Sequence, residues 1–345
     1  MRKIDDEIQA LLLEHRGDIR SILKDNHRLD LLYALSSQRE LLLEWYDFEP
    51  EAEVLQVGAD YGALTGLFRS SVRAVTVLDD TESALETVRQ RYPGAANIYY
   101  RKDSLAGYAA EACAEGKKYD YVIFAGTLTA PYEKHIHAAK SLLKPDGILI
   151  VALANALGMK YFAGTVEEEN ALTKRQLAEL LCGDKETQSM ADESGTLKFY
   201  YPMPDYKTPV SIYSDAYLPK KGDLTRVTPA YDYPPYHLME QGEKFDTVCE
   251  AGLFDLYANS YLVFWSADPK QLQKEDERIF MKYNKTRREE FQIKTCICER
   301  NAAGAETGNK ERYVEKAALS LDGSAHIASF KEKYEKLTKQ HRTLK

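Results

Sequence analysis

The sequence predicts an α/β protein whose core is a doubly wound, mostly parallel β-sheet. Strand-like and helix-like patterns alternate between residues 53 and 153, a glycine turn (Gly58 to Gly62) follows the first strand, and the second strand ends in an acidic pair, Asp79-Asp80. Such alternation is typical of parallel strands joined by helices on both faces of a sheet. A glycine turn with a following acid predicts a ligand site at the carboxyl edge of that sheet.

The alternation assigns the elements in chain order. Strands are expected at 53–57, 74–78, 97–101, 120–125 and 147–153, with Pro145-Asp146-Gly147 as a turn before the last of them, and helices at 62–70, 81–92, 104–115 and 132–143. A capped helix at 173–182 and strands near 197–201 and 257–264 follow. The Tyr- and Pro-rich stretch between those two strands is far longer than a hairpin needs, so a lid or binding loop is expected at about 202–256.

The two ends of the chain differ from this pattern. Leucine and isoleucine recur at helical spacing through residues 5–45, and Ser36 or Ser37 can cap a further helix with Glu40 as capping-box partner. We expect three regions: a helical cover on the sheet at 1–50, a main domain at 51–268, and a small α+β extension at 269–345. The extension has strands at 278–284, 291–299 and 312–320, a loose turn at 301–310 and a basic helix from Phe330.

Composition excludes several classes of protein. The chain has 345 residues and a formal charge of −8, so no broad basic face predicts nucleic-acid binding. No apolar run is long enough for a membrane span, and the charged N-terminus does not resemble a secretory signal, so a cytoplasmic protein is expected. Five scattered cysteines, including Cys296 and Cys298 on one face of a strand, fit reduced, buried thiols, and no metal site is expected.

The spacing of the glycines narrows the choice of ligand. The turn reads Gly58-x-x-x-Gly62, and Asp60 stands where a dinucleotide fingerprint has its middle glycine. A carboxylate there would repel a pyrophosphate but suits a ligand with a cationic amino acid end, which favours S-adenosylmethionine (SAM) over NAD. The alternative is a plain strand–turn–helix without a ligand.

Several motifs carry a resemblance to a known family. They are Leu35-Ser36, Arg39-Glu40, Leu43-Glu44-Trp45, Val57-Gly58-Ala59, Gly62-Ala63-Leu64-Thr65-Gly66, Asn155, Gly158 to Gly164, Tyr200 to Lys207, Asp215 to Pro219, and Ala258 to Tyr261. The chain resembles a class I SAM-dependent methyltransferase from 52 to 153. Over 36–266 it is similar to a bacterial methyltransferase domain of proteins that make cell-surface polysaccharides. The resemblance implies a Rossmann-like sheet of seven strands.

The resemblance also implies a set of cofactor residues at the ends of four strands. Gly58, Ala59 and Gly62 would lie under the methionine end of SAM, Asp79 would hold the ribose hydroxyls, and Asp80 would lie beside the adenosine. Asp103 would accept from the adenine amino group, Ser104 and Leu105 would contact the ring, and Ala125-Gly126 would line the reacting methyl. Asp80 and Asp103 could instead cap the helices that follow them.

This chain departs from the family at two positions. Gln56 stands where such enzymes carry an acid that pairs with the cofactor's amino group, so the bond to that group would lose its charge assistance. Ala154 precedes Asn155, where relatives have Glu-Asn.

Methyl transfer needs alignment and a dry site, and a hydroxyl acceptor also benefits from a base. The candidate catalytic residues are His237, Asn155 and Asp205, of which His237 lies in the Tyr-rich insertion. His135 and His137 do not share a helix face, which argues against a two-histidine metal site.

Two functions remain open from the sequence. The first is a SAM-dependent methyltransferase that methylates an oxygen of a saccharide or related small molecule. The second is a degenerate, non-catalytic SAM-binding scaffold within a polysaccharide-assembly protein, suggested by Gln56 and Ala154. A nucleic-acid methyltransferase is disfavoured by the acidic charge. The sequence does not specify the acceptor or the oligomeric state.

Overall fold

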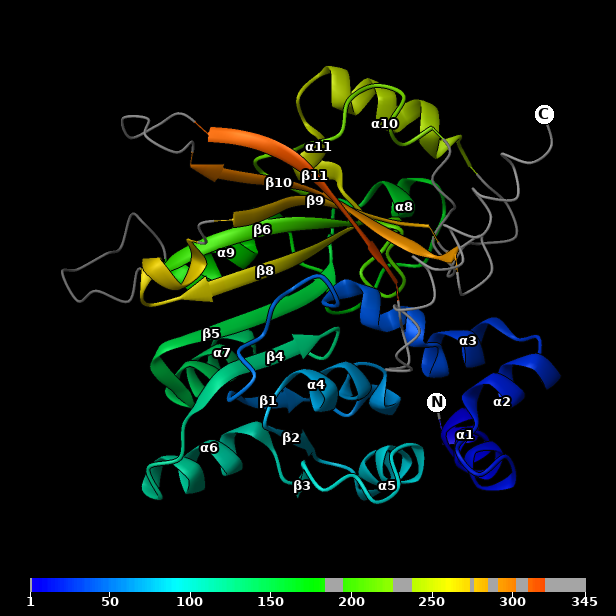
Figure 1. Ribbon diagram of the computed structural model, residues 1–345, viewed down its shortest axis with the longest axis vertical. Helices are drawn as coiled ribbons and strands as arrows, with labels where there is room; N and C mark the ends of the chain where they lie inside the picture. Colours follow the sequence, from blue (N-terminus) through cyan, green and yellow to red (C-terminus); the bar gives the residue numbers. More distant parts are fainter. Residues whose placement is uncertain are drawn as a thin grey trace, which may run out of the picture.

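The structure is a computed structural model, and it describes residues 2–183, 195–225, 238–273, 276–284, 291–301 and 310–319. The basic helix expected from Phe330 and nearly all of the expected turn at 301–310 lie outside these residues. A single sheet of eleven strands runs through the molecule in the order β11-β10-β9-β7-β6-β8-β5-β4-β1-β2-β3 (Figure 1). The predicted α/β class is confirmed.

The parallel half of the sheet follows the sequence prediction closely. It contains β1 (Glu53–Val57), β2 (Ala74–Asp79), β3 (Ile98–Lys102), β4 (Tyr119–Ala125) and β5 (Leu143–Ala154), and all four neighbouring pairs are parallel. The helices between these strands are α4 (Thr65–Ser71), α5 (Glu82–Arg91), α6 (Leu105–Ala114) and α7 (Tyr132–Ser141). This half occupies the lower part of Figure 1.

The predicted seven-stranded sheet is wrong, because further strands join the same sheet beyond β5. The antiparallel part contains β6 (Thr196–Met203), β7 (Ser211–Ser214), β8 (Ser260–Ser266), β9 (Asp276–Asn284), β10 (Ile293–Asn301) and β11 (Lys310–Ala318). An unpaired edge would expose backbone donors and acceptors, and each added strand satisfies those of its neighbour. The expected C-terminal strands are therefore confirmed, but they extend the sheet.

Two more local expectations are corrected by the structure. Pro145-Asp146-Gly147 is no turn before a strand, because β5 already begins at Leu143. The extra residues are absorbed in a register shift, in which Tyr119 pairs with Leu143 and Tyr121 pairs with Ile148. Part of the segment expected to be a lid, β7, is a strand with four buried residues.

Most tyrosines of the Tyr-rich region that the structure describes are packing residues. Tyr200, Tyr201, Tyr206 and Tyr213 are each at most 4% exposed. Tyr231, Tyr233, Tyr236 and the candidate base His237 lie outside the described residues.

Both faces of the sheet are buried, which explains the nearly continuous apolar strands. Val54 and Ile150 point into one core, under α4 and α5, whereas Leu55 and Val151 point into the other. The second core is covered by α6, α7, α9 (Lys174–Cys182), α10 (Gln241–Glu250) and α11 (Phe254–Tyr257). The predicted cap of α9 is confirmed as a capping box between Thr173 and Gln176.

The N-terminal region forms the expected helical cover. It consists of α1 (Arg2–Glu14), α2 (Ile19–Asp25), α3 (Leu29–Leu35) and the 3-10 helix η1 (Ser37–Leu42), and Ser36 caps η1 by accepting from Gln38 N. A small core of its own includes Ile8, Leu12 and Ile22. The cover packs beside α5 (Figure 1) and reaches the glycine turn, because Tyr61 donates a hydrogen bond to Asp5 at 2.7 Å.

The Tyr61–Asp5 hydrogen bond gives a first testable prediction. Burial and the Asp5 carboxylate raise the pKa of Tyr61, so the phenol stays protonated and remains a donor. Tyr61→Phe removes this tether, and amide exchange in α1 is expected to become about fivefold faster, which corresponds to one ordinary hydrogen bond. Hydrogen-exchange mass spectrometry measures it. Tyr99→Phe, at an exposed position, is the control, and an unchanged rate in α1 would refute the tether.

The remaining features agree with the composition. Cys296 and Cys298 are free and buried, as predicted, and burial raises the pKa of Cys296 to about 12. Within the described ranges, no helix is long and apolar enough to cross a membrane.

Candidate functional site

The glycine turn bends sharply at the carboxyl end of β1. Gly58, Asp60, Tyr61 and Gly62 all have positive φ angles, of 86°, 40°, 54° and 71°. A Cβ atom added to Gly58 would lie 2.5 Å from the side chain of Thr127, so only glycine fits there. The chain thereby enters the short 3-10 helix η2 (Asp60–Gly62) and then α4. With this geometry, the backbone of the turn lies at the carboxyl end of β1 without bulky side chains over Gly58 and Gly62.

Gln56 supports this turn from below. Its Nε2 donates to the carbonyl oxygens of Gly58 and Ala59, at 3.1 and 3.2 Å, and its Oε1 accepts from the Thr65 hydroxyl at 2.8 Å. The side chain is 5% exposed. A carboxylate could not donate to two carbonyls, so the amide at this position has a physical reason. We expected Gln56 to contact the ligand, but its hydrogen bonds within the protein do not favour that contact.

Asp79 lies at the end of β2, next to the turn. Its Oδ2 accepts from Ala59 N at 2.9 Å, and its Oδ1 accepts from the backbone N and the hydroxyl of Thr81 at 2.9 and 2.7 Å. The carboxylate is thus fixed in orientation, and each oxygen retains capacity to accept from a ligand. Asp80 is exposed and makes no hydrogen bond to any residue in the described part of the chain, and the N-cap position of α5 is Thr81.

Asp103 and Ser104 follow the end of β3. Ser104 is the N-cap of α6 and accepts from Gly107 N at 3.1 Å, so the alternative that Asp103 caps this helix is wrong. Asp103 remains partly exposed, and its backbone N donates to Asp79 O at 3.1 Å. Asp79 therefore ends β2 and Asp103 follows the neighbouring strand β3, and the Asp103 carboxylate lies against the first turn of α6, where its Oδ1 accepts from the Ser104 hydroxyl at 3.5 Å.

Ala125 and Gly126 complete the edge at the end of β4. Gly126 N donates to Ala152 O at 2.7 Å, and the amide of Asn170 donates to Gly126 O at 3.2 Å. A Cβ atom on Gly126 would lie 2.6 Å from the hydroxyl of Tyr206, so this tyrosine covers the strand end.

The sheet order brings the predicted cofactor residues together. Strands β4, β1, β2 and β3 are consecutive neighbours and parallel, so their carboxyl ends form one edge (Figure 1). Along it Gly58, Asp79, Asp103, Ala125 and Gly126 are partly exposed. The bent turn and both carboxylates therefore lie along the carboxyl ends of neighbouring strands.

An ion pair joins the N-terminal cover to this edge. Arg39 contacts the Asp60 carboxylate at 2.6 Å and also donates to Tyr33 O at 3.1 Å. Burial lowers the pKa of Arg39, but Asp60 and other acidic neighbours outweigh burial, so the net pKa shift is upward. Asp60, expected to face a cationic ligand group, already has one oxygen paired with Arg39.

Two candidate catalytic residues have structural contacts. Asn155 is fully buried, its Nδ2 donates to Leu256 O and Ala258 O at 2.7 Å each, and its Oδ1 accepts from Leu157 N at 2.9 Å. Asp205 is also fully buried, and its two oxygens accept from Lys160 Nζ at 2.7 Å and Lys207 N at 2.9 Å. These contacts do not favour proton transfer with a substrate.

A charged cluster around Lys160 was missed by the sequence reasoning. Lys160, in the short helix α8 (Met159–Phe162), is fully buried and contacts Glu168 at 2.8 Å as well as Asp205. Glu168 is 18% exposed, and it also pairs with Lys207 at 3.1 Å and accepts from the Tyr206 hydroxyl at 3.2 Å. One signal was available in the sequence. Lys160 lies between the apolar residues Met159 and Tyr161, which indicates a buried lysine that needs an acidic partner.

The electrostatics of this cluster fix its protonation. Burial raises the pKa of Asp205, but the charges of Lys160 and Lys207 lower it by more than burial raises it. The net pKa shift is therefore downward, and the carboxyl is ionised at neutral pH. Burial, Glu168 and Asp205 raise the pKa of Tyr206 well above its usual range. Tyr206 is therefore a permanent donor between Glu168 and Gly126. No group of His, Cys, Asp and Glu suited to a metal ion occurs among the described residues.

Comparisons with known proteins give distant structural likenesses. No family model matches the chain, and no curated protein matches it. Among solved structures, the phosphoethanolamine N-methyltransferase 1 of Haemonchus contortus, in complex with phosphoethanolamine and S-adenosylhomocysteine, is 13% identical with a TM-score of 0.41. That match covers 76% of this chain and 48% of the other, about half of its length.

Two further structures are similarly distant. A putative SAM-dependent methyltransferase from Streptococcus mutans is 12% identical with a TM-score of 0.38, covering 66% of this chain and 47% of the other. A TehB-like SAM-dependent methyltransferase from Corynebacterium glutamicum is 11% identical with a TM-score of 0.37, covering 66% and 86%. Likeness at this level assigns no activity, so a functional proposal depends on the geometry of the edge.

Proposed function

We propose that this protein is a SAM-dependent methyltransferase that methylates a hydroxyl of a saccharide or related small molecule. The observation that supports it most is the convergence of the bent glycine turn, Asp79, Asp103 and Gly126 on one edge of the parallel strands. The residues fit the adenosine part of SAM, because two partly exposed carboxylates at adjacent strand ends provide acceptors for hydroxyl and amino groups.

Each residue of the edge has a role in this proposal. Asp79 would accept from the ribose hydroxyls, and Asp103 from the adenine amino group. The backbone from Gly58 to Gly62 would approach the methionine part closely, and Gln56 would keep that backbone in place. When bound, SAM supplies a methyl group on a positively charged sulfur.

The molecule that receives the methyl group would bind beside the residues that cover Gly126. Tyr206 excludes water there, and Glu168 is the partly exposed carboxylate of the charged cluster. Glu168 would accept a hydrogen bond from an acceptor hydroxyl and take its proton as the oxygen–methyl bond forms and the methyl–sulfur bond breaks, while Lys207 would donate to a second oxygen. Carboxylate and ammonium groups beside a tyrosine ring suit a polyhydroxylated acceptor.

Calorimetric titration with SAM tests the binding half of this proposal, and saturable heat at micromolar to millimolar SAM is the expected result. No heat at millimolar SAM would contradict it.

Glu168→Gln tests the catalytic half. The variant is expected to bind SAM unchanged but to lose about 100-fold in transfer rate, because the amide keeps the size of the side chain and loses its charge. Transfer is measured with radiolabelled SAM on a panel of methyl glycosides and nucleotide sugars. Glu167→Gln, at the neighbouring exposed residue, is the matched control. Equal transfer by both variants would remove Glu168 from the acceptor site.

A second function, a SAM-binding scaffold without turnover, is favoured by one observation. The side chains of Gln56, Asn155 and Asp205 form hydrogen bonds with other groups of the protein, and Lys160 pairs with the charge of Asp205. Binding of SAM without transfer to any member of the glycan panel would support the scaffold over the enzyme.

A further inference from the structure

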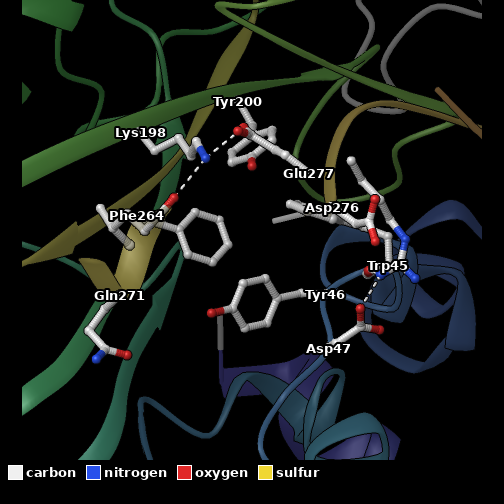
Figure 2. Close-up of a pocket in the computed structure, with 11 residues that line it drawn as sticks. Trp45, Tyr46, Asp47, Lys198, Tyr200, Phe264, Gln271, Asp276 and Glu277 are labelled. Carbon is white, nitrogen blue, oxygen red and sulfur yellow. Dashed lines mark hydrogen bonds and ion pairs between the residues drawn. The ribbon is translucent and has the colours of Figure 1, made fainter. Parts of the chain in front are cut away.

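The segment that follows the N-terminal cover packs on the antiparallel part of the sheet through aromatic rings. The rings of Trp45 and Tyr200 have centroids 4.8 Å apart, and those of Tyr46 and Phe264 5.0 Å apart (Figure 2). Because these rings already contact one another, they form a packing interface. The cover reaches the glycine turn by a contact of a different kind, through the buried side chain of Arg91 at the end of α5.

The glycine turn needs support because three consecutive residues have positive φ angles. Asp60, Tyr61 and Gly62 have φ angles of 40°, 54° and 71°. In this region a Cβ atom comes too close to the following carbonyl oxygen, so Asp60 and Tyr61 cost free energy in this conformation. Such a backbone persists only where the surrounding structure holds it.

Helix α5 holds the end of the turn opposite to the one that Gln56 supports. The Tyr61 carbonyl oxygen accepts from Arg91 Nη1 at 2.9 Å, and the Gly62 carbonyl oxygen accepts from the Tyr92 hydroxyl at 2.9 Å. Burial raises the pKa of Tyr92, so this hydroxyl keeps its proton and remains a donor. Both side chains also pack on the turn, because a Cβ atom added to Gly62 would lie 3.1 Å from the Tyr92 ring and 3.3 Å from Arg91 Cδ.

The cover fixes the guanidinium of Arg91 in turn. Nη2 donates to Leu35 O at 2.9 Å, and Nη1 donates to Ala34 O at 3.2 Å as well as to Tyr61 O. Ala34 and Leu35 end α3, and the last carbonyl groups of a helix have no partner within it. Because a guanidinium is planar and rigid, the bonds to α3 determine the direction of the bond to the turn.

We propose that Arg91 is a positioning residue for SAM, which it serves by holding the turn in the shape that receives the methionine part. This inference rests on the proposed function. Arg91 acts through the turn, because it is only 7% exposed and donates to backbone carbonyl groups. A turn that is fixed before the ligand arrives lowers the ordering cost of binding. The adenosine part is assigned to Asp79 and Asp103, so its binding depends less on Arg91.

Arg91→Met tests this role by comparing two ligands. The variant is expected to bind SAM about tenfold more weakly than wild type, because the Tyr61 carbonyl loses its donor and the turn loses its fixed shape. Binding of 5′-methylthioadenosine, which has the adenosine and the sulfur but no amino acid part, should change by less than about twofold. Calorimetric titration of the full chain measures both ligands. Arg89→Met, in the same helix with a side chain 36% exposed, is the matched control and should bind SAM within about twofold of wild type.

Two milder variants separate a lost contact from a damaged fold. Arg91→Lys keeps the charge and one donor but not the planar fork, so its SAM affinity should lie between those of wild type and Arg91→Met. Tyr92→Phe removes only the hydrogen bond to Gly62 O and should weaken SAM binding about fivefold, with 5′-methylthioadenosine binding again unchanged.

Hydrogen exchange reports on the turn without any ligand. The amides of Gly62 and Ala63 donate to Ala59 O and Asp60 O at 2.8 and 3.0 Å, so their exchange depends on the shape of the turn. In Arg91→Met they should exchange about tenfold faster, while amides of β1 remain unchanged. Unchanged exchange in the turn, equal SAM affinity of wild type and Arg91→Met, or equal weakening of both ligands would overturn the proposal. A wild-type protein that binds no SAM would remove the proposed function, and the exchange rates would still decide whether Arg91 holds the turn.

Discussion

Asp79→Ala is expected to weaken SAM binding about 100-fold, the loss of two hydrogen bonds from ribose hydroxyls to a carboxylate. Ala59 N and the two donors of Thr81 would also lose their acceptor, so the glycine turn would be less ordered. Asp79→Asn should have an intermediate effect, because one oxygen remains to accept from Ala59 N. Isothermal calorimetry with SAM measures each dissociation constant.

An acid away from the proposed site provides the control. Asp146 is exposed near the start of β5, so Asp146→Ala should change the SAM dissociation constant by less than about threefold. Thermal unfolding of each variant shows whether the turn or the fold was damaged. Unchanged SAM affinity in a folded Asp79→Ala protein would remove the basis of the proposed function.

Lys160→Met is expected to lower the free energy of unfolding by about 3–5 kcal/mol. The substitution leaves the Asp205 carboxylate fully buried without its ammonium partner, and Glu168 loses one of its two lysines. Urea denaturation measures the loss. Lys207→Met is the comparison, because Lys207 is 24% exposed and water can replace it, so a loss of about 1 kcal/mol or less is expected there.

The double variant Lys160→Met, Asp205→Leu tests whether the unpaired charge causes this loss. Removing both partners of a buried pair should restore much of the stability, with an interaction energy of at least about 1 kcal/mol between the two sites. Additive losses in this double-mutant cycle would show that Lys160 and Asp205 act independently.

The loss of stability at acidic pH should also depend on the pair of Lys160 and Asp205. The folded-state pKa of Asp205 lies below 3.8, so its contribution is fully present above about pH 4 and is lost as the pH falls through the folded-state pKa. In the double variant this part of the acid destabilisation should be absent. Unfolding free energies measured between pH 2 and pH 6 compare the two proteins, and identical slopes would contradict this assignment.

The parallel half could be predicted from the sequence because its signals are local. The apolar runs of β1, β2 and β4, the glycine turn and the acid at the end of β2 can each be recognised from a short, continuous stretch of sequence. The number of strands could not be predicted in the same way. Whether β9 pairs with β7 or lies in a separate layer depends on contacts between distant segments, which periodicity does not report.

The site shows the same division. The sequence placed Asp79, Asp103 and Gly126 at strand ends, and the parallel register brings them together. It could not show that Asn155 and Asp205 are occupied by buried partners, because those partners lie up to 103 residues away. Gln56 was interpreted as a weakened ligand contact, whereas its amide holds two carbonyl groups of the turn.

The C-terminal strands contact the N-terminal cover directly. Arg278 bonds Asp47 and the carbonyl of Trp45, and the Tyr283 hydroxyl bonds Leu41 O at 2.8 Å. These partners are 231 to 242 positions apart in the chain. During synthesis on a ribosome, the contacts of residues 41–47 with β9 therefore cannot form until more than 230 further residues have been made. Their partners in the parallel half are made much earlier, so closure of this seam is expected to follow the folding of that half.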